Sequence, residues 1–337
     1  MSRREHLLEV RNLEVVYPAR GGTVQAVRDV SFTVDEGEST GIVGESGSGK
    51  STIARAALGL VELPGRIVGG EVLWRGRSLR NKKYARQVRG PEISVVSQDP
   101  MASMSPILTI GTQMTEVMVR HLDLGKKEAV VRAGDLLEKV GIPDPGRRLG
   151  QYPFEFSGGM QQRVVIAIAL SCDPKMLIAD EPTTALDVTT QAQILDLISS
   201  LRRDLGLSLL LITHDLGVVA GACDLLNVLY AGEIVESGTA DELFYRPHHP
   251  YTAALLGSTP RLDVKAERLT AIEGQPPDLR QVVAGCSFAP RCPYATGRCE
   301  SSPTLGTSSA GRACACWHPL DSHQGNLTGS EGRLGHA

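Results

Sequence analysis

Gly44-Glu45-Ser46-Gly47-Ser48-Gly49-Lys50-Ser51, followed by Thr52, lies between an apolar stretch and a segment of helical periodicity. It fits the pattern G-x-x-x-x-G-K-[ST], in which glycines let backbone N–H groups surround phosphate oxygens at a helix start. In this pattern the lysine reaches the β- and γ-phosphates, and the hydroxyl after it binds Mg²⁺. A flexible glycine turn is the alternative, but chance produces the pattern in roughly 1% of chains of this length. The stretch therefore predicts a phosphate-binding loop in an α/β fold.

Length and charge limit the class of protein around this loop. The chain has 337 residues, 42% of them apolar, which suffices for one large α/β domain and a smaller appendage. Its net charge of −3 disfavours a protein that grips nucleic acid through phosphates. Residues 1–10 lack the apolar core of a signal peptide, and no apolar run approaches the roughly 18 residues of a membrane span. We expect a soluble, cytosolic protein that reaches a membrane only through a partner.

Two carboxylates, Asp180 and Glu181, follow the apolar stretch Met176–Ala179, which is typical of a buried parallel strand. Ligands in open α/β sheets bind at the ends of such strands. Asp180 suits coordination of Mg²⁺, and Glu181 suits a general base that polarises the attacking water. Alone, the pair could simply end a strand. Beside a phosphate loop it predicts a site of nucleotide hydrolysis.

Three further segments carry polar residues at the borders of predicted elements. Ser157-Gly158-Gly159 opens a helical segment and forms a second anion-binding helix start, although an ordinary helix cap is the alternative. Gln98 follows the predicted strand Ile93–Ser97, and His214 follows the predicted strand Leu209–Thr213. Residues 107–140 and Met160–Leu170 have helical periodicity.

In this order and spacing, the motifs resemble those of ABC ATPases over roughly residues 5–245. The resemblance implies a P-loop NTPase fold with a RecA-like core, an antiparallel β subdomain and an α-helical signature subdomain at about 100–160. The signature reads Phe-Ser-Gly-Gly-Met where Leu-Ser-Gly-Gly-Gln is commonest, and both changed positions flank the Ser-Gly-Gly contact. The remaining matches are the Q-loop Gln98, the D-loop Ala185-Leu186-Asp187, the switch histidine His214, and Tyr17 where the family stacks adenine on an aromatic ring.

The family resemblance also implies how the site works. Two nucleotide-binding domains pack head to tail, so Ser157, Gly158, Gly159 and the D-loop Asp187 would serve ATP held by the partner's phosphate loop. His214 would hold the γ-phosphate and the attacking water. Mg²⁺ would be held by Ser51, Gln98 and Asp180, and Gln98 would couple it to a membrane subunit.

Three stretches resemble the ATPases of dipeptide and oligopeptide importers: Gln98–Pro106, Phe154–Arg163 and His249–Leu256. The resemblance implies an ATPase at the cytoplasmic face of the membrane that works with two permease subunits, a second ATP-binding subunit and an extracytoplasmic peptide-binding protein. Nickel, glutathione and oligosaccharide importers share the C-terminal region, so these solutes are alternatives. An ABC-type ATPase acting on nucleic acid or ribosomes is another, but the interval from Lys50 to Asp180 is compact and has no heptad array.

Cysteines cluster near the C-terminus. Cys286, Cys292, Cys299 and Cys316 lack the close C-x-x-C pairs of most structural zinc sites. Four thiolates without nearby carboxylates nevertheless suit a soft metal centre, either zinc or an iron–sulfur cluster. Resemblance to importer ATPases implies a [4Fe–4S] cluster, with zinc as the alternative and free thiols as the third possibility. Cys314 and His318 are rivals for the fourth ligand. We predict three regions: residues 1–245 as the nucleotide-binding domain, 246–320 as a C-terminal extension, and 321–337 as a disordered tail.

Overall fold

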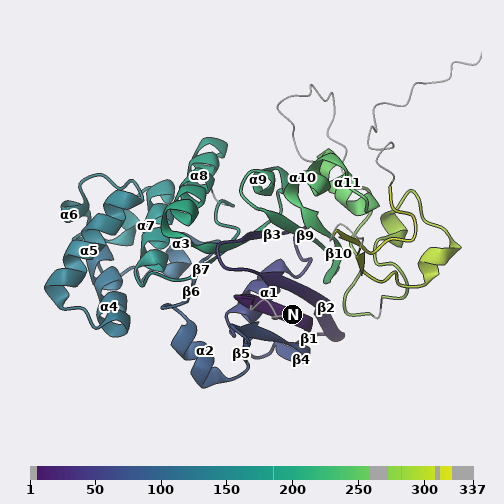
Figure 1. Cartoon of the computed structure of the whole chain (residues 1–337), viewed down its shortest axis with the longest axis horizontal. Helices are drawn as coiled ribbons and strands as arrows, with labels where there is room; N and C mark the ends of the chain where they lie inside the picture. Colours follow the sequence, from purple (N-terminus) through teal and green to yellow (C-terminus); the bar gives the residue numbers. More distant parts are fainter. Residues whose placement is uncertain (1–5, 185, 259–271, 282, 308–311, 321–337) are drawn as a thin grey trace, which may run out of the picture.

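The computed structural model describes residues 6–184, 186–258, 272–281, 283–307 and 312–320. The predicted tail at 321–337 and the D-loop residue Ala185 therefore lie outside the described residues. Figure 1 shows a central sheet, an antiparallel sheet below it, a group of helices at one end and the C-terminal region at the other.

The central sheet has the strand order β11-β12-β10-β9-β3-β8-β7-β6. The strands β9, β3, β8, β7 and β6 run parallel, whereas β10, β12 and β11 add antiparallel pairs at one edge. The bounds are β3 (Ser39–Val43), β6 (Ile93–Val96), β7 (Met176–Asp180), β8 (Ser208–Thr213), β9 (Leu225–Tyr230), β10 (Glu233–Thr239), β11 (Gly306–Thr307) and β12 (Ala313–Cys314). The predicted buried strands are confirmed.

Both faces of this sheet are covered, which explains why its strands are continuously apolar. Along β8, Leu210 and Ile212 face one apolar core, and Leu209 and Leu211 face the other, because successive side chains point to opposite faces of a strand. The first core includes Ile53 of helix α1 (Lys50–Ala57) and the antiparallel sheet. The second is covered by helices such as α7 (Gly158–Leu170), α8 (Val188–Leu205) and α9 (Leu216–Ala220).

The antiparallel sheet has the order β2-β1-β4-β5 and is built from residues near the N-terminus. Its strands are β1 (Leu8–Ala19), β2 (Gly22–Val34), β4 (Arg66–Trp74) and β5 (Arg77–Ser78), and helix α2 (Lys82–Val88) follows them. Alternate residues of β1, among them Leu8, Val10, Leu13 and Val15, are buried. This sheet and α1 place the phosphate loop between two layers.

The predicted helical run at 107–140 is two helices, α4 (Ile110–Leu122) and α5 (Lys126–Lys139). The break falls at Asp123, whose φ of 53° is incompatible with continuing the helix. Short elements complete this end of the molecule: α3 (Pro100–Ser103), α6 (Pro145–Arg148) and η1 (Pro153–Glu155). In Figure 1 these teal elements lie beside the β6 edge of the sheet.

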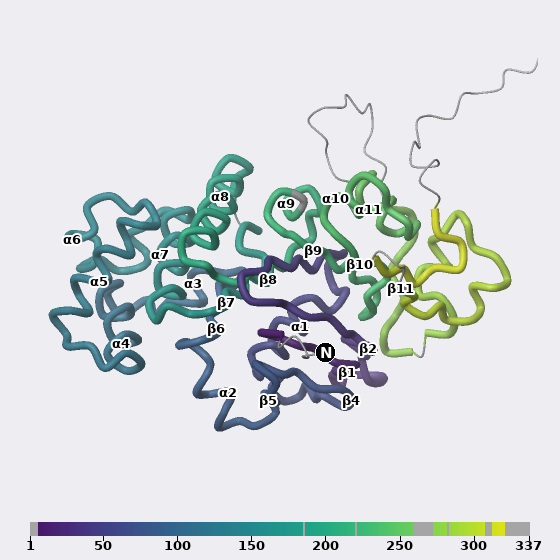
Figure 2. The backbone as a smooth tube through the Cα atoms, viewed as in Figure 1, coloured from purple at the N-terminus to yellow at the C-terminus, as the bar shows by residue number. Residues whose placement is uncertain are grey.

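The C-terminal region lies at the other end of the central sheet, as the yellow part of Figure 2 shows. It follows α10 (Ala240–Tyr245) and includes α11 (Pro250–Ser258), η2 (Ala289–Arg291) and η3 (Gly297–Glu300). Its strand β12 pairs with β10, where the fully buried Glu236 forms an ion pair with Arg312 and accepts hydrogen bonds from the backbone N–H groups of His248 and His249. None of the helices in the described parts of the chain is long and apolar enough to cross a membrane.

Candidate functional site

The phosphate loop connects β3 to α1 and is packed against neighbouring backbone on two sides. A Cβ at Gly44 would lie 2.1 Å from the carbonyl oxygen of Leu229, and one at Gly49 would lie 2.2 Å from that of Ala26. Gly49 also has φ 106°, which L side chains rarely adopt. The two glycines are therefore required by close approach, and they fix the loop at the start of α1.

Lys50 is 4% exposed and points back into the loop that precedes it. Its Nζ donates hydrogen bonds to the carbonyl oxygens of Gly44 at 2.8 Å and Glu45 at 3.0 Å, and it lies 3.7 Å from a carboxylate oxygen of Glu181. Burial lowers the pKa of Lys50, and Glu181 opposes this effect. The ammonium group thus lies between the phosphate loop and Glu181, the predicted general base.

Ser51 and Asp180 meet across this site. The Ser51 hydroxyl donates to Oδ1 of Asp180 at 3.1 Å, and burial raises the pKa of Asp180. A hydroxyl and a carboxylate are hard oxygen donors of the kind that Mg²⁺ uses beside nucleotide phosphates. These residues therefore fit the predicted Mg²⁺ ion.

Two predicted residues, Gln98 and His214, converge on Glu181 together with Thr184. Gln98 Nε2 and the Thr184 hydroxyl donate to its Oε2 at 3.2 and 2.9 Å, and His214 Nδ1 lies 3.5 Å from the same oxygen. Gln98, Glu181 and His214 follow the neighbouring parallel strands β6, β7 and β8, whose carboxyl ends share one edge of the sheet. Glu181 also has φ 48°, a strained conformation for a residue with a Cβ.

An open cavity of about 240 Å³ lies over these groups. Its lining brings together most of the predicted loop residues with Gln98 and Glu181. The lining residues are Ala26, Ser46, Gly47, Gly49, Lys50, Ser51, Thr52, Gln98 and Glu181. Of these, Ala26 was missed by sequence analysis, as was Thr184 beside Glu181, although Thr184 lies only three positions after the carboxylate that it contacts.

Other predicted residues lie elsewhere. Ser157 is the N-cap of α7, Asp187 is the N-cap of α8, and neither lines the cavity. A Cβ at Gly159 would lie 2.8 Å from the Thr190 side chain, so the two helix starts are adjacent. Asp187 accepts hydrogen bonds from Thr190 N–H and hydroxyl, which lower its pKa. Gly158 and the β1 residue Tyr17, whose ring packs against Gly65, also lie outside the cavity lining.

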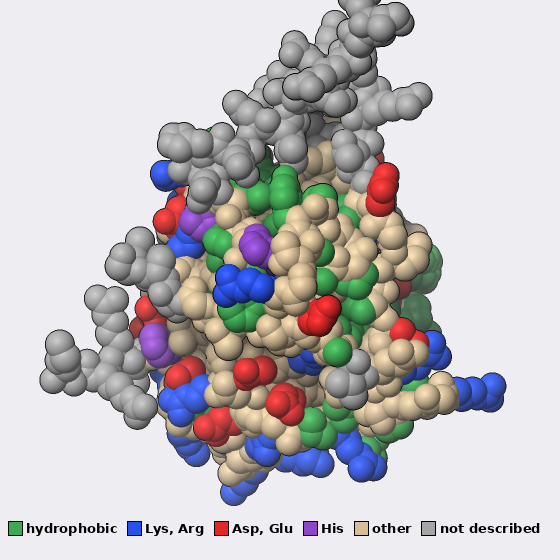
Figure 3. Space-filling view, turned by 90° about the vertical axis from the view of Figure 1, so that its right-hand side faces the viewer, with side chains coloured by type: hydrophobic (Ala, Val, Ile, Leu, Met, Phe, Trp, Pro, Cys, Tyr) green, Lys and Arg blue, Asp and Glu red, His purple; other side chains and the backbone are tan. Residues whose placement is uncertain are grey.

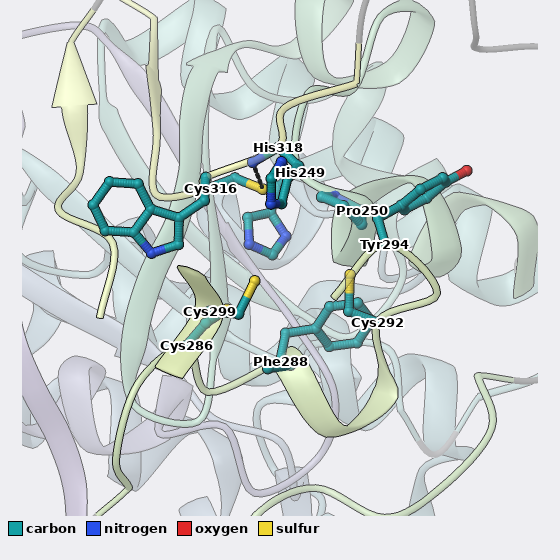
Figure 4. A pocket seen from close by; sticks show the side chains of 11 residues that line it. His249, Pro250, Cys286, Phe288, Cys292, Tyr294, Cys299, Cys316 and His318 are labelled. Atoms are coloured by element: carbon teal, nitrogen blue, oxygen red, sulfur yellow. Dashed lines mark hydrogen bonds between the residues drawn. The ribbon is translucent and has the colours of Figure 1, made fainter. Parts of the chain in front are cut away.

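The prediction of a metal site among the cysteines is wrong. Cys286, Cys292, Cys299 and Cys316 do line one small cavity with His249 (Figure 4), but its volume is about 10 Å³, roughly that of a single water. No group of three or more His, Cys, Asp or Glu in the described residues could hold a metal ion. This result contradicts both the [4Fe–4S] cluster and zinc.

The environment of the thiols gives a physical reason. Burial raises the pKa of Cys286 and Cys292, and raises that of Cys316 to about 11, which favours neutral thiols over the thiolates that bind metals. The rivals do not complete a site either. Cys314 lies in β12, outside the cavity lining, and the His318 ring is hydrogen-bonded to Thr296 at 2.7 Å.

Comparison with known families agrees with this geometry. Residues 27–184 match the family described as ABC transporter, and residues 235–299 match the one described as the oligopeptide/dipeptide transporter C-terminal region. The chain is 47% identical to the oligopeptide transport ATP-binding protein OppD of Salmonella typhimurium over 94% of each chain. It belongs to the ABC transporter family of oligopeptide and dipeptide ATP-binding proteins.

A second relative and a solved structure support the same family and fold. Identity to the dipeptide transport ATP-binding protein DppD of Bacillus subtilis is 49%, over 93% of this chain and 95% of that protein. Among solved structures, the bacterial ABC transporter cassette MJ0796, determined as a dimer, is 27% identical with a TM-score of 0.62. The similarity covers 69% of this chain and 98% of the cassette. The predicted P-loop ABC ATPase fold is confirmed.

Proposed function

We propose that this chain hydrolyses ATP to drive the import of di- or oligopeptides. The observation that carries the proposal is the convergence of Gln98, Thr184 and His214 on Glu181, 3.7 Å from the lysine of the phosphate loop. Such a carboxylate is placed to accept a proton from water beside a bound γ-phosphate. The peptide specificity is supported by the names of the relatives, OppD and DppD, over nearly the whole chain.

In the proposed mechanism, Lys50 exchanges the carbonyl oxygens of Gly44 and Glu45 for the β- and γ-phosphates of ATP. Ser51, Asp180 and Gln98 would hold Mg²⁺, which would supply charge neutralisation at the phosphates when bound. Glu181 polarises the attacking water, and His214 orients that water and the γ-phosphate. The N–H groups of the loop from Ser46 to Thr52 bind phosphate oxygens, and Tyr17 stacks on adenine.

A second ATP-binding subunit completes the site in this proposal. Ser157, Gly158, Gly159 and Asp187 lie outside the cavity of their own chain, which supports a role at the partner's nucleotide. The related cassette MJ0796 was solved as a dimer, with ADP and Pi in a post-hydrolysis state. Residues 1–245 would form this motor, with the helical subdomain at about 100–160, and residues 246–320 would form the C-terminal extension.

The motor would sit at the cytoplasmic face of the membrane, held there by two permease subunits, with an extracytoplasmic binding protein delivering the peptide. Transport of nickel, glutathione or oligosaccharide by the same motor is the second candidate. Action on nucleic acid is disfavoured by the net charge of −3. The face seen in Figure 3 carries acidic and basic side chains intermixed rather than a uniformly basic surface.

The test is Glu181→Gln in membrane vesicles that contain the whole transporter. The variant should still bind ATP, and hydrolysis should fall by at least about 100-fold, the effect typical of losing a general base. Uptake of a labelled tripeptide should fall with it. Uptake by the variant that continues at the wild-type rate would refute the assignment of Glu181. If hydrolysis by the wild-type transporter is stimulated by nickel but not by peptide, the solute is that of the second candidate.

A further inference from the structure

The phosphate loop is held from the C-terminal region through one residue, Glu45. The two carboxylate oxygens of Glu45 accept hydrogen bonds from Nη1 and Nη2 of Arg291 at 2.7 and 3.0 Å. This is a bidentate, charge-assisted contact, the geometry in which arginine binds carboxylates most strongly. It joins the end of η2 to a residue 246 positions earlier in the sequence.

Arg291 is itself fixed by surrounding groups. Its side chain is 4% exposed, and its remaining donors reach the carbonyl oxygens of Glu273 at 3.0 Å and Ile272 at 3.1 Å. Nη1 also lies 3.3 Å from the hydroxyl of Tyr230 at the end of β9. The contact with Glu45 raises the pKa of Arg291, so the guanidinium stays charged. The C-terminal region therefore presents a positive charge of defined position to the phosphate loop.

The backbone of Glu45 is held from the same region. Its N–H donates to the hydroxyl of Tyr251 at 2.9 Å, and Tyr251 is fully buried in α11. The Tyr251 ring packs against Tyr230 and Phe288, with ring centroids 4.5 and 5.4 Å away. Arg291 thus holds the side chain of Glu45, and Tyr251 holds its backbone N–H.

These contacts matter for the nucleotide because Glu45 is part of the loop that surrounds it. The carbonyl oxygen of Glu45 accepts a hydrogen bond from Lys50, so a shift of Glu45 changes what holds the lysine. An unpaired carboxylate at Glu45 would also repel the phosphates of ATP. Arg291 and Tyr251 do not line the cavity, and the contacts that link them to it run through Glu45 of the loop.

The geometry points to Arg291 as a positioning residue for ATP. By neutralising Glu45 and fixing its place, it keeps the phosphate loop in the shape that receives the phosphates. The C-terminal region, beyond any role in assembly, thereby sets the affinity of the motor for nucleotide. This inference rests on the proposed function, because it concerns ATP bound at the same cavity.

The test compares full-length Arg291→Gln, Arg291→Lys and the double variant Arg291→Gln with Glu45→Gln. Loss of the charged contact should raise the Kd and KM for Mg-ATP about tenfold, the lower limit of what a charge-assisted hydrogen bond contributes. The kcat should stay within about threefold, because Glu181 and its partners are untouched. Lysine should recover part of the affinity, and the double variant should recover most of it, because the unpaired carboxylate is gone.

The matched control is Arg280→Gln, since Arg280 also makes a bidentate contact in the C-terminal region, from Nε and Nη2 to the two carboxylate oxygens of the exposed Asp278. It should leave Kd, KM and kcat unchanged. Thermal unfolding without nucleotide separates a folding defect from a change in affinity. The inference is overturned if Arg291→Gln binds ATP like the control, or if the double variant binds as weakly as the single one. A wild-type chain without ATPase activity would instead refute the proposed function.

Discussion

His249, one residue before α11, is 1% exposed and lies beside the small cysteine-lined cavity. Its Nδ1 accepts a hydrogen bond from the backbone N–H of Tyr251 at 3.0 Å, so this nitrogen carries no proton. Burial lowers its pKa from 6.5 to about 4, although the buried carboxylate of Glu236 acts in the opposite direction. The unfolded chain therefore binds a proton on His249 more tightly than the folded chain does.

This difference predicts an acid-sensitive stability. Between pH 6.5 and about 4 the unfolded chain binds a proton on His249 and the folded chain does not, so lowering the pH favours unfolding. The full stability is present above pH 6.5, and roughly 3 kcal/mol of the unfolding free energy is lost by pH 4. Urea unfolding across this range measures it.

His249→Asn is the matched variant, because an asparagine oxygen can accept the Tyr251 N–H without titrating. Its unfolding free energy should decline less steeply with falling pH than that of the wild type. Parallel pH profiles for the two proteins would show that His249 does not contribute.

Residues of the site can be predicted from the sequence where the signal is local, and cannot where the contact is distant in the chain. Lys50 and Ser51 belong to one contiguous motif, and Asp180 and Glu181 end one apolar strand, so their proximity follows from parallel strand geometry. Arg291 contacts Glu45 across 246 positions, and no local pattern reports such a contact. The cysteine spacing misled for a related reason: spacing does not say whether buried thiols meet around a space large enough for a metal centre.

At the scale of elements, the phosphate loop and α1 provide a comparison between two glycines. Gly47 and Gly49 both have positive φ, 80° and 106°, but only Gly49 has backbone in the path of a Cβ. Gly47→Ala should cost about 1 kcal/mol for the left-handed conformation alone. Gly49→Ala should also displace the loop from Ala26 and abolish ATP binding.

Thermal unfolding and ATP titration of the two alanine variants check this prediction. Gly47→Ala should unfold a few degrees below the wild type and bind ATP with an affinity reduced by no more than about tenfold. Equal loss of binding in both variants would mean that the close approach at Ala26 does not decide the loop conformation.

Element prediction succeeded where periodicity or capping chemistry was present. The sequence pattern Thr239-x-x-Glu242 predicts a capping box, and this box opens α10. The break at Asp123 was missed because an aspartate, unlike glycine, gives no strong sign of positive φ. Strands β11 and β12, of two residues each, are too short to show an alternating pattern, so their addition to the central sheet required the structure.

At the scale of the whole molecule, the cavity and the start of α7 are separate surfaces of one chain. The cavity is lined by residues around the phosphate loop, whereas Ser157 and Gly159 lie at the start of α7, next to the start of α8. Head-to-tail pairing of two cassettes would bring each signature to the other subunit's cavity. In a transporter with two different ATP-binding subunits, the phosphate loop of this chain and its signature would therefore serve two different sites, which can be tested separately.

In such a heterodimer, Lys50→Ala should impair the site whose phosphate loop belongs to this chain, because the buried lysine is the cation of that loop and lies 3.7 Å from Glu181. Ser157→Arg should instead impair the site whose phosphate loop belongs to the other subunit, since Ser157 does not line its own cavity. Each loss should be at least about tenfold in photolabelling by an azido-ATP analogue, with the second site of each variant labelled normally. If Ser157→Arg blocked labelling of its own chain, the signature would act within one subunit, and the second cassette would not be needed to complete the site.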